Sequence, residues 1–231
     1  MNVLNLPNAQ NVFVHEDIEA LSAAVAQRTA TLAAQAIAAR GVFHLGLAGG
    51  ETPRRCYEKL RGLAVDWAHV QIYFGDERCL PRDDIQRNDR MISATLLAHI
   101  RIPPANIHTI PAELGAQAAA AAYADVLKNI ARLDLILLGM GEDGHTASLF
   151  PDNPATLSVA SVVPVFNAPK LPAERVSLGM STLNAARQKI FLTAGAAKQK
   201  ALADMSYGKP LPASCVVAAE WHLDRAALPN I

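Results

Sequence analysis

The sequence predicts an α/β protein with a mostly parallel sheet and helices on both of its faces. Segments with a helical pattern alternate along the chain with short apolar segments. The apolar segments are hydrophobic throughout, which is typical of strands covered by helices on both sides. Three of these segments end in glycine-rich or charged loops, and ligands of such sheets bind outside the carboxyl ends of the strands. The predicted arrangement is Rossmann-like, with its ligand site at those ends.

The first predicted helix has the clearest boundaries. Residues 17–40 are rich in Ala, a strong helix former, with Asp17 as candidate N-cap and Gly41 as candidate terminator. The second helix begins at Thr52 and Pro53, with Thr as N-cap and Pro at the first helical position, a favoured order. The predicted helices after the first cover about residues 52–61, 88–99, 113–130, 182–187 and 196–206.

The predicted strands are short and lie between these helices. No repeat, low-complexity segment or long linker interrupts the alternation, so we expect one α/β domain over residues 1–231. A chain of this length buries roughly 70–75% of its unfolded surface and forms a core without disulfides. The predicted strands are residues 42–48, 70–74 and 133–138, with further extended runs at 159–166, 175–180 and 189–194.

Charge and cysteine content exclude several classes of protein. The 21 Lys and Arg residues balance 21 Asp and Glu residues, so the basic excess of a nucleic-acid binder is missing. Cys56, Cys79 and Cys215 are widely spaced, which predicts neither a disulfide framework nor a thiolate metal site. No apolar segment approaches the ~20 residues that span a bilayer, and no signal peptide is visible. We expect a cytoplasmic protein with neither a nucleic-acid nor a membrane partner.

The first of the three unusual loops contains Gly49 and Gly50, between a strand and a helix. Glycines let an anion approach the backbone, and the free N–H groups of a helix N-terminus attract phosphate. Thr52 adds a hydroxyl donor. The alternative is an ordinary tight turn with a Thr cap, and the carboxylate of Glu51 opposes an anion unless it points away.

The second loop follows the strand at 70–74 and begins with Asp76, Glu77 and Arg78. Side chains at a strand end enter the expected cleft, and an Arg there suits bidentate recognition of phosphate or carboxylate. The structural alternative for Asp76 and Arg78 is a local ion pair. Most other charged residues between 76 and 90 are expected on a solvated face.

The third loop, Gly139 to Gly144, matches the GxGxxG pattern of dinucleotide-binding proteins. No acidic residue follows about 20 positions later, and Glu142 and Asp143 stand where a pyrophosphate would lie, so a nicotinamide or flavin site is not predicted. His145 closes the loop, and an imidazole with a pKa near ~6.5 suits a general base. A structural histidine is the alternative. The other histidines lack metal-ligand spacing, so no metal site is predicted.

Lys198 follows the extended run at 189–194 and lies in the first turn of a predicted helix. A cation there opposes the helix dipole unless an anion binds nearby, so Lys198 is either a phosphate ligand or a surface lysine. Ser148 is outside any GxSxG context, and no Cys has a nucleophile context. Direct attack by water is therefore favoured over covalent catalysis.

Five segments along the chain match a known sequence pattern. They are AGGETP at 48–53, FGDER at 74–78 with Pro81 and Asn88, LILLGMGEDGHTASLFP at 135–151, RVSL at 175–178 and GAAK at 195–198. Together they resemble the 6-phosphogluconolactonase family over nearly the whole chain, and the glycine loop with DGHTASLFP is the most specific part. Two residues depart from the family pattern: Glu51 stands where Ser is frequent, and Arg87 replaces the usual Ser before Asn88.

The resemblance implies hydrolysis of 6-phosphoglucono-δ-lactone to 6-phosphogluconate, the second step of the oxidative pentose phosphate route, with a sugar phosphate as the small-molecule partner and no metal or cofactor. The family is related in fold to glucosamine-6-phosphate deaminases and ribose-5-phosphate isomerases. The deaminase signature resembles DGHIAFNEP, whereas this chain reads DGHTASLFP and has Asp-Glu-Arg at the earlier strand end. Both differences favour the lactonase.

The expected roles follow from the loops and the resemblance together. His145 takes a proton from water and returns one to the ring oxygen, while Asp76 orients either the imidazole or the water. The backbone amides of Gly141 and Gly144 are expected to stabilise the oxyanion. The expected substrate- and phosphate-binding residues are Gly49, Gly50, Thr52, Arg78, Asn88 and Lys198.

Two other functions stay open from the sequence. One is a related sugar-phosphate deaminase or isomerase. The other is a non-catalytic sugar-phosphate sensor of the kind found in transcriptional regulators, which would normally carry a helix-turn-helix segment before the sugar domain. The chain has one helical stretch before its first predicted strand and no basic recognition helix, which disfavours the sensor.

Overall fold

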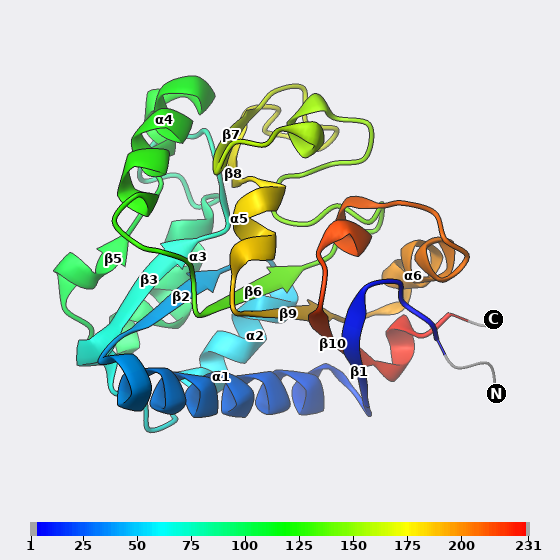
Figure 1. Ribbon diagram of the computed structural model, residues 1–231, viewed down its shortest axis with the longest axis horizontal. Coiled ribbons are helices and arrows are strands. Elements are labelled where there is room, and N and C mark those ends of the chain that lie inside the picture. The colour runs from blue at the N-terminus through cyan, green and yellow to red at the C-terminus, as the bar shows by residue number, and fades with distance from the viewer. Residues whose placement is uncertain (1–3, 230–231) are drawn as a thin grey trace.

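A large sheet runs through the centre of the protein, whose computed structural model describes residues 4–229 (Figure 1). Its strands are β1 (Ala9–His15), β2 (Phe43–Leu47), β3 (Val70–Phe74), β5 (Ile107–His108), β6 (Leu135–Gly139), β9 (Gln188–Thr193) and β10 (Ala219–Asp224). The order is β1-β10-β9-β6-β2-β3-β5, and every neighbouring pair is parallel. The predicted α/β class with a mostly parallel, Rossmann-like sheet is confirmed.

A second sheet of three antiparallel strands stands apart from the first. It consists of β4 (Asp76–Arg78), β8 (Arg175–Leu178) and β7 (Val162–Val165), in that order. The extended runs at 159–166 and 175–180 are therefore strands, but they leave the large sheet. Asp76 to Arg78 was expected as a loop, because three charged residues carry no apolar strand pattern. Pairing with β8 makes this segment a strand.

In residues 4–229, six α-helices surround the sheets. Figure 1 shows α1 and α2 below the large sheet, with α4, α5 and the small sheet above it. The predicted ends of α1 are confirmed, since the Asp17 carboxylate accepts the N–H of Ala20 at 2.8 Å and Gly41 donates to the carbonyl of Ile37. The helices are α1 (Ile18–Arg40), α2 (Glu51–Leu60), α3 (Asn88–Thr95), α4 (Ala116–Leu127), α5 (Met180–Ala185) and α6 (Gln199–Ser206).

Several sequence predictions of element boundaries were wrong. The N-cap of α2 is Gly50 and the helix starts at Glu51, so Thr52 lies inside the first turn and is not its cap. The predicted helix 88–99 ends at Thr95 and continues as a 3₁₀ turn, and 113–130 shortens to α4. Three strands besides β4 were missed: β5 has only two residues, and β1 and β10 carry polar residues in place of a continuous apolar run.

The buried apolar side chains of both sheets and their helices form one continuous core. Leu45, Ile72 and Leu137, in the middle strands, are fully buried, and each such side chain contributes about 1.5–3 kcal/mol to folding. Among residues 4–229, no helix is both long and apolar enough to cross a membrane. Packing on both faces leaves the ends of the strands as the place for a ligand.

Candidate active site

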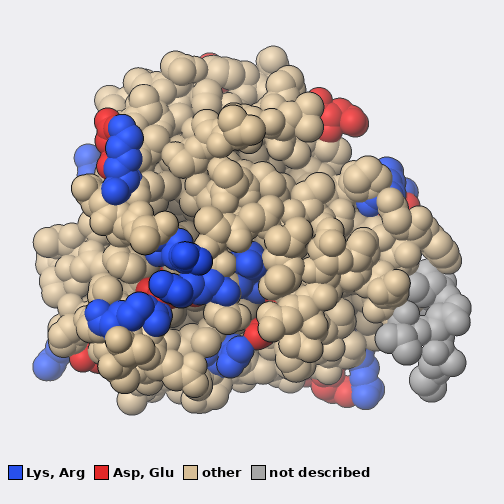
Figure 2. Space-filling model, viewed as in Figure 1, with Lys and Arg blue, Asp and Glu red and all other residues tan. Residues whose placement is uncertain are grey.

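A cleft of about 620 Å³ lies at the carboxyl ends of the central strands, within the usual range for small-molecule sites. Its walls come from the loops after β2, β6 and β9 and from β4, which are the segments that the sequence singled out. Lys and Arg side chains gather near the middle of the molecular face in Figure 2. The predicted site residues that line the cleft are Gly49, Gly50, Thr52, Asp76, Arg78, Asn88, Gly141, His145 and Lys198.

The N-terminus of α2 opens into this cleft. Gly50, the N-cap, makes no side-chain cap hydrogen bond, so the first N–H groups of the helix are available to an anion. Gly49 is required by close packing, because a Cβ at this position would lie 2.0 Å from Oδ1 of Asn88. The sequence predicted both glycines, and the second reason for Gly49 emerges only from the structure.

Glu51 also lines the cleft, but its carboxylate has partners on its own helix. It forms ion pairs with Arg54 at 2.6 Å and with Arg55 at 3.1 Å. The hydrogen bond from Arg54 is the main reason that the pKa of Glu51 is lowered. The negative charge is therefore compensated in part along the helix, which weakens the objection raised by the sequence.

His145 forms a close pair with Asp143. Its Nδ1 lies 2.5 Å from Oδ1 of Asp143. Burial raises the pKa of Asp143, but the hydrogen bond and charge of His145 outweigh this effect and lower the pKa to about 2. An ionised Asp143 accepts a hydrogen from Nδ1 and leaves Nε2 as the basic nitrogen. Gly141 makes the pair possible, because a Cβ there would lie 2.0 Å from Nδ1.

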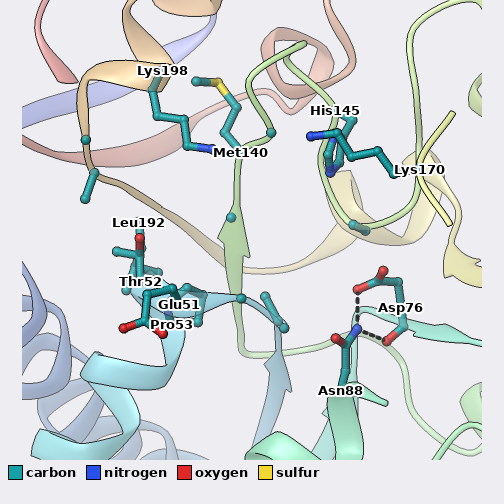
Figure 3. Close-up of a pocket in the computed structure, with 18 of the residues that line it drawn as sticks. Glu51, Thr52, Pro53, Asp76, Asn88, Met140, His145, Lys170, Leu192 and Lys198 are labelled. Carbon is teal, nitrogen blue, oxygen red and sulfur yellow. Dashed lines mark hydrogen bonds between the residues drawn. The ribbon is translucent and has the colours of Figure 1, made fainter. Parts of the chain in front are cut away.

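Asp76 is buried and held by two other side chains. Its Oδ2 accepts a hydrogen bond from the hydroxyl of Ser148 at 2.6 Å. The side-chain amide of Asn88 donates to its Oδ1 at 3.1 Å and to its backbone carbonyl at 3.0 Å (Figure 3). The carboxylate bonded to the imidazole is thus that of Asp143, and Asn88 supports Asp76. Ser148 is fully buried and its hydroxyl is bonded to Asp76, so it does not face the cleft as a nucleophile would.

The backbone amides of Gly141 and Gly144 are already occupied. Gly141 donates to the carbonyl of His145 at 2.8 Å, and Gly144 donates to the carbonyl of Gly141 at 3.1 Å. Gly144 also lies outside the residues that line the cleft. The predicted oxyanion role of these two amides is therefore not retained, because neither N–H is free to bind a developing charge.

Lys170 and Lys198 line the cleft, and neither side chain has a hydrogen bond or ion pair with any residue between 4 and 229. Lys198 lies in a 3₁₀ turn just before α6. Burial is the main reason that its pKa is lowered; the carboxylates of Glu142 and Asp143 oppose this effect, and the charge of Lys170 adds to it. A bound anion would stabilise the ammonium form. The position of Lys198 on the cleft and its lack of a partner therefore favour a phosphate ligand over a surface lysine.

Two arginines add to the positive charge of the cleft. Arg78 donates to the carbonyl of Gln86, while its buried Nε has no partner in the described part of the chain. Arg175 is 5% exposed and donates to the carbonyl of Lys170 at 2.9 Å. Burial lowers the pKa of Arg175, and the nearby Asp76 carboxylate opposes that effect.

The sequence reasoning missed Asp143, Lys170 and Arg175 as site residues. Asp143 lies two positions before His145, and this spacing within the glycine loop could have indicated a carboxylate–imidazole pair. Arg175 begins a segment that was noted only for its family resemblance. Lys170 lies in the connection between β7 and β8, where no strand-end signal marks it.

Comparisons with known proteins agree with this geometry. A family model described as glucosamine-6-phosphate isomerases/6-phosphogluconolactonase matches residues 16–223. The chain belongs to this family. A relative named 6-phosphogluconolactonase, from Mycobacterium leprae, is 35% identical to this chain over 242 residues, and the match covers 96% of this chain and 98% of the relative.

Solved structures of the family share the fold. The crystal structure of 6-phosphogluconolactonase from Thermotoga maritima superposes with a TM-score of 0.87 at 28% identity, covering 93% of this chain and 99% of that one. A monomeric glucosamine-6-phosphate deaminase reaches 0.83 at 22% identity, covering 94% and 98%. The fold alone thus serves both reactions, and the site has to distinguish them.

Proposed function

We propose that this protein hydrolyses 6-phosphoglucono-δ-lactone to 6-phosphogluconate. The observation that carries the proposal is the Asp143–His145 pair on a cleft that also contains the free N-terminus of α2. The cleft thus offers a general base and an anion site together. The relatives named 6-phosphogluconolactonase, which match over nearly the whole chain, support the same substrate.

The substrate's phosphate is assigned to one end of the cleft. In Figure 3, Thr52 lies at the start of α2, and Lys198 extends into the cleft from the opposite wall. The N–H groups at Gly49 and Gly50, the hydroxyl of Thr52 and the ammonium of Lys198 supply donors for a phosphate. Arg78, Lys170 and Arg175 add positive potential that attracts a phosphorylated substrate.

The lactone ring then lies between His145 and Asp76, which face each other at the other end of the cleft (Figure 3). Nε2 of His145 takes a proton from water as the oxygen attacks the C1 carbonyl, and the ionised Asp143 stabilises the resulting imidazolium. When the bond between C1 and the ring oxygen breaks, the imidazolium returns the proton to that oxygen. Asp76, fixed by Ser148 and Asn88, orients the attacking water.

A coupled assay tests this function directly. Glucose-6-phosphate dehydrogenase generates the lactone, and its disappearance is followed with and without the protein. We expect faster disappearance with the wild-type protein. Lactone decay at the spontaneous rate in the presence of purified, folded protein would overturn the proposal.

The deaminase is the second candidate, because a solved deaminase shares the fold. Incubation with glucosamine 6-phosphate and an ammonia assay separates the two reactions. We expect no ammonia above background, in keeping with the sequence DGHTASLFP after the glycine loop.

A cytoplasmic location is part of the proposal. Its support is the presence of three free cysteines, Cys56, Cys79 and Cys215, the last of them exposed, which suits a reducing compartment. The equal numbers of acidic and basic residues favour a small-molecule partner over a nucleic acid.

A further inference from the structure

Glu77 is buried between two residues of the cleft. Asp76, Glu77 and Arg78 form β4, in which successive side chains point to opposite faces. Asp76 and Arg78 line the cleft, whereas Glu77 lies on the other face with 1% of its surface exposed. The sequence placed most of this charged segment on a solvated face, so the burial of Glu77 requires its own explanation.

The carboxylate of Glu77 accepts three backbone hydrogen bonds. Oε1 accepts the N–H of Arg78 at 2.8 Å and that of Asn88 at 2.7 Å, and Oε2 accepts the N–H of Asp89 at 2.8 Å. Asn88 and Asp89 are the first residues of α3, whose N-cap residue, Arg87, makes no side-chain cap bond. Glu77 therefore caps α3 from strand β4, outside the helix itself, and fixes where the helix begins.

Asn88, the residue fixed in this way, holds the Asp76 carboxylate. Its backbone N–H is bonded to Glu77, and its side-chain amide is bonded to Asp76. Hydrogen bonds thus connect the buried carboxylate of Glu77, through the backbone and side chain of Asn88, to Asp76 at the reacting end of the cleft.

Arg87 compensates the charge of this buried carboxylate. Its guanidinium is 4.0 Å from Glu77, and its hydrogen bonds go to Asp89 at 2.8 Å and Glu113 at 2.8 Å. Burial raises the pKa of Glu77 to about 7, against the three N–H donors, which lower it. A buried carboxylate is a costly way to stabilise a core, because apolar residues of similar volume often do so equally well. A role in positioning accounts for its presence.

We propose that Glu77 is a positioning residue, which acts through Asn88 to hold the Asp76 carboxylate where the hydrolytic reaction needs it. The inference rests on the proposed function, and it concerns a side chain that touches neither the cleft nor the substrate. Its role is to fix a neighbour's geometry to within a fraction of an ångström.

Two substitutions at Glu77 test the role in the lactone assay. Glu77→Ala removes all three acceptor contacts, and we expect kcat to fall by roughly 10²-fold, the cost of a misplacement of about 1 Å, with KM nearly unchanged. Glu77→Gln keeps one oxygen for Arg78 and Asn88 and loses the acceptor for Asp89, so its kcat should lie between those of the wild type and Glu77→Ala. A wild-type kcat in Glu77→Gln and Glu77→Ala would overturn the proposal.

Asp134→Asn is the matched control. Asp134 is also a buried carboxylate that accepts a backbone N–H, from His44 at 2.9 Å, but it lies at the opposite ends of the strands. We expect this variant to melt earlier than the wild type and to keep its kcat at 25 °C. If Glu77→Ala and Asp134→Asn both melted earlier and both kept the wild-type kcat, the role of Glu77 would be structural only.

A double-mutant cycle tests the path through Asn88. If Glu77 acts through this residue, the Glu77→Gln/Asn88→Ala double variant should have the kcat of Asn88→Ala alone, within about 2-fold. Multiplied losses would overturn the path.

Crystal structures of the wild type and Glu77→Ala give a readout that is independent of activity. We expect the Asn88 amide to lose its bond to Asp76 in the variant. An unchanged bond would overturn the role of Glu77, whatever the activity of the protein. Failure of the wild-type protein to hydrolyse the lactone would instead count against the proposed function alone.

Discussion

Charges at the two ends of the parallel strands have different surroundings. At the amino ends, Asp134 accepts hydrogen bonds from Arg40 at 2.7 Å and from the amide of His44 at 2.9 Å. Lys189 is also paired there and donates to the carbonyl of Ala186 at 3.1 Å. At the carboxyl ends, Lys170 and Lys198 have no such partner within residues 4–229.

This difference separates charges that stabilise the fold from charges held ready for a ligand. Lys170 is exposed and Lys198 is half-buried. Partial burial of an ammonium group without a partner costs free energy, so the retention of Lys198 indicates an anion that binds there. Position relative to the cleft separates two carboxylate–histidine pairs. Asp143 and His145 line or adjoin the cleft, whereas Asp66 and His69 form a 2.7 Å pair in an exposed turn. Substitutions at the two ends should therefore affect different quantities.

The largest effect is expected at His145. His145→Ala should lower kcat by ~10²–10⁴-fold, the usual contribution of a general base, and leave KM nearly unchanged. Steady-state kinetics on the lactone measure both. His69→Ala is the matched control, since it removes the histidine of the exposed pair and should keep the wild-type kcat. A wild-type kcat in His145→Ala would remove His145 as the base.

A smaller effect is expected at the phosphate end. Lys198→Ala should raise KM for the phosphorylated lactone by roughly 10–100-fold, because one charge-assisted contact is worth about 1.5–3 kcal/mol. KM for gluconolactone without the phosphate should not change. Lys200→Ala, two positions along the chain and paired with Asp204 at 2.8 Å, serves as the control. Equal losses on both substrates would contradict the phosphate role of Lys198.

At the amino ends the effect should appear in stability alone. Asp134→Ala leaves the amide of His44 without its acceptor and should lower the free energy of unfolding by about 1–3 kcal/mol. Denaturant unfolding measures this loss, and kcat per folded molecule should stay at the wild-type value. The exposed Asp125, paired with Lys128, is the control, and its alanine variant should lose less than ~0.5 kcal/mol. A fall in the kcat of Asp134→Ala would contradict the distinction between the two ends of the strands.

The smallest effect concerns pH and the edge of the sheet. His222 is buried beside His15, at 2.9 Å, and near Glu220, which is paired with Arg28. Burial and the charge of His15 lower the pKa of His222 to about 4. The unfolded chain takes up the proton more readily, so the stability from this group is complete above ~6.5 and falls as pH drops toward 4.

Between pH ~7 and ~5.5 the expected loss at His222 is about 1 kcal/mol. Urea unfolding at the two pH values measures it. His222→Gln removes the titrating group and should flatten this part of the pH dependence. An equally steep dependence in His222→Gln would assign the effect to other groups.

The part of the site that the sequence predicts is the part made by local pattern. The turn at Gly49 and Gly50 and the loop that carries His145 each lie directly after an apolar strand, so their place at the sheet's carboxyl ends follows from the topology rule. The same pattern predicted α1 with both caps. The expectation of one domain over residues 1–231 stays a prediction.

The rest depends on contacts between distant segments. Glu77 and Arg87 resemble surface charges in the sequence, because their partners are backbone amides and residues as far away as Glu113. β1 and β10 lack a continuous apolar run, since they contain polar residues such as His15, Glu220 and His222. In the structure His15 is bonded to His222, and Glu220 is paired with Arg28. These contacts join residues about 190 to 210 positions apart, so they form only in the folded sheet and no local pattern reveals them.

The position of β10 between β9 and β1 has a consequence for synthesis on the ribosome. β1 is complete after residue 15, yet its neighbour in the sheet ends at residue 224. β1 therefore cannot pair with β10 until about 200 further residues have been translated. Contacts so distant in sequence slow folding and leave an unpaired strand open to other chains. The pairing of β1 with β10 is accordingly expected to be a late step in the folding of this sheet.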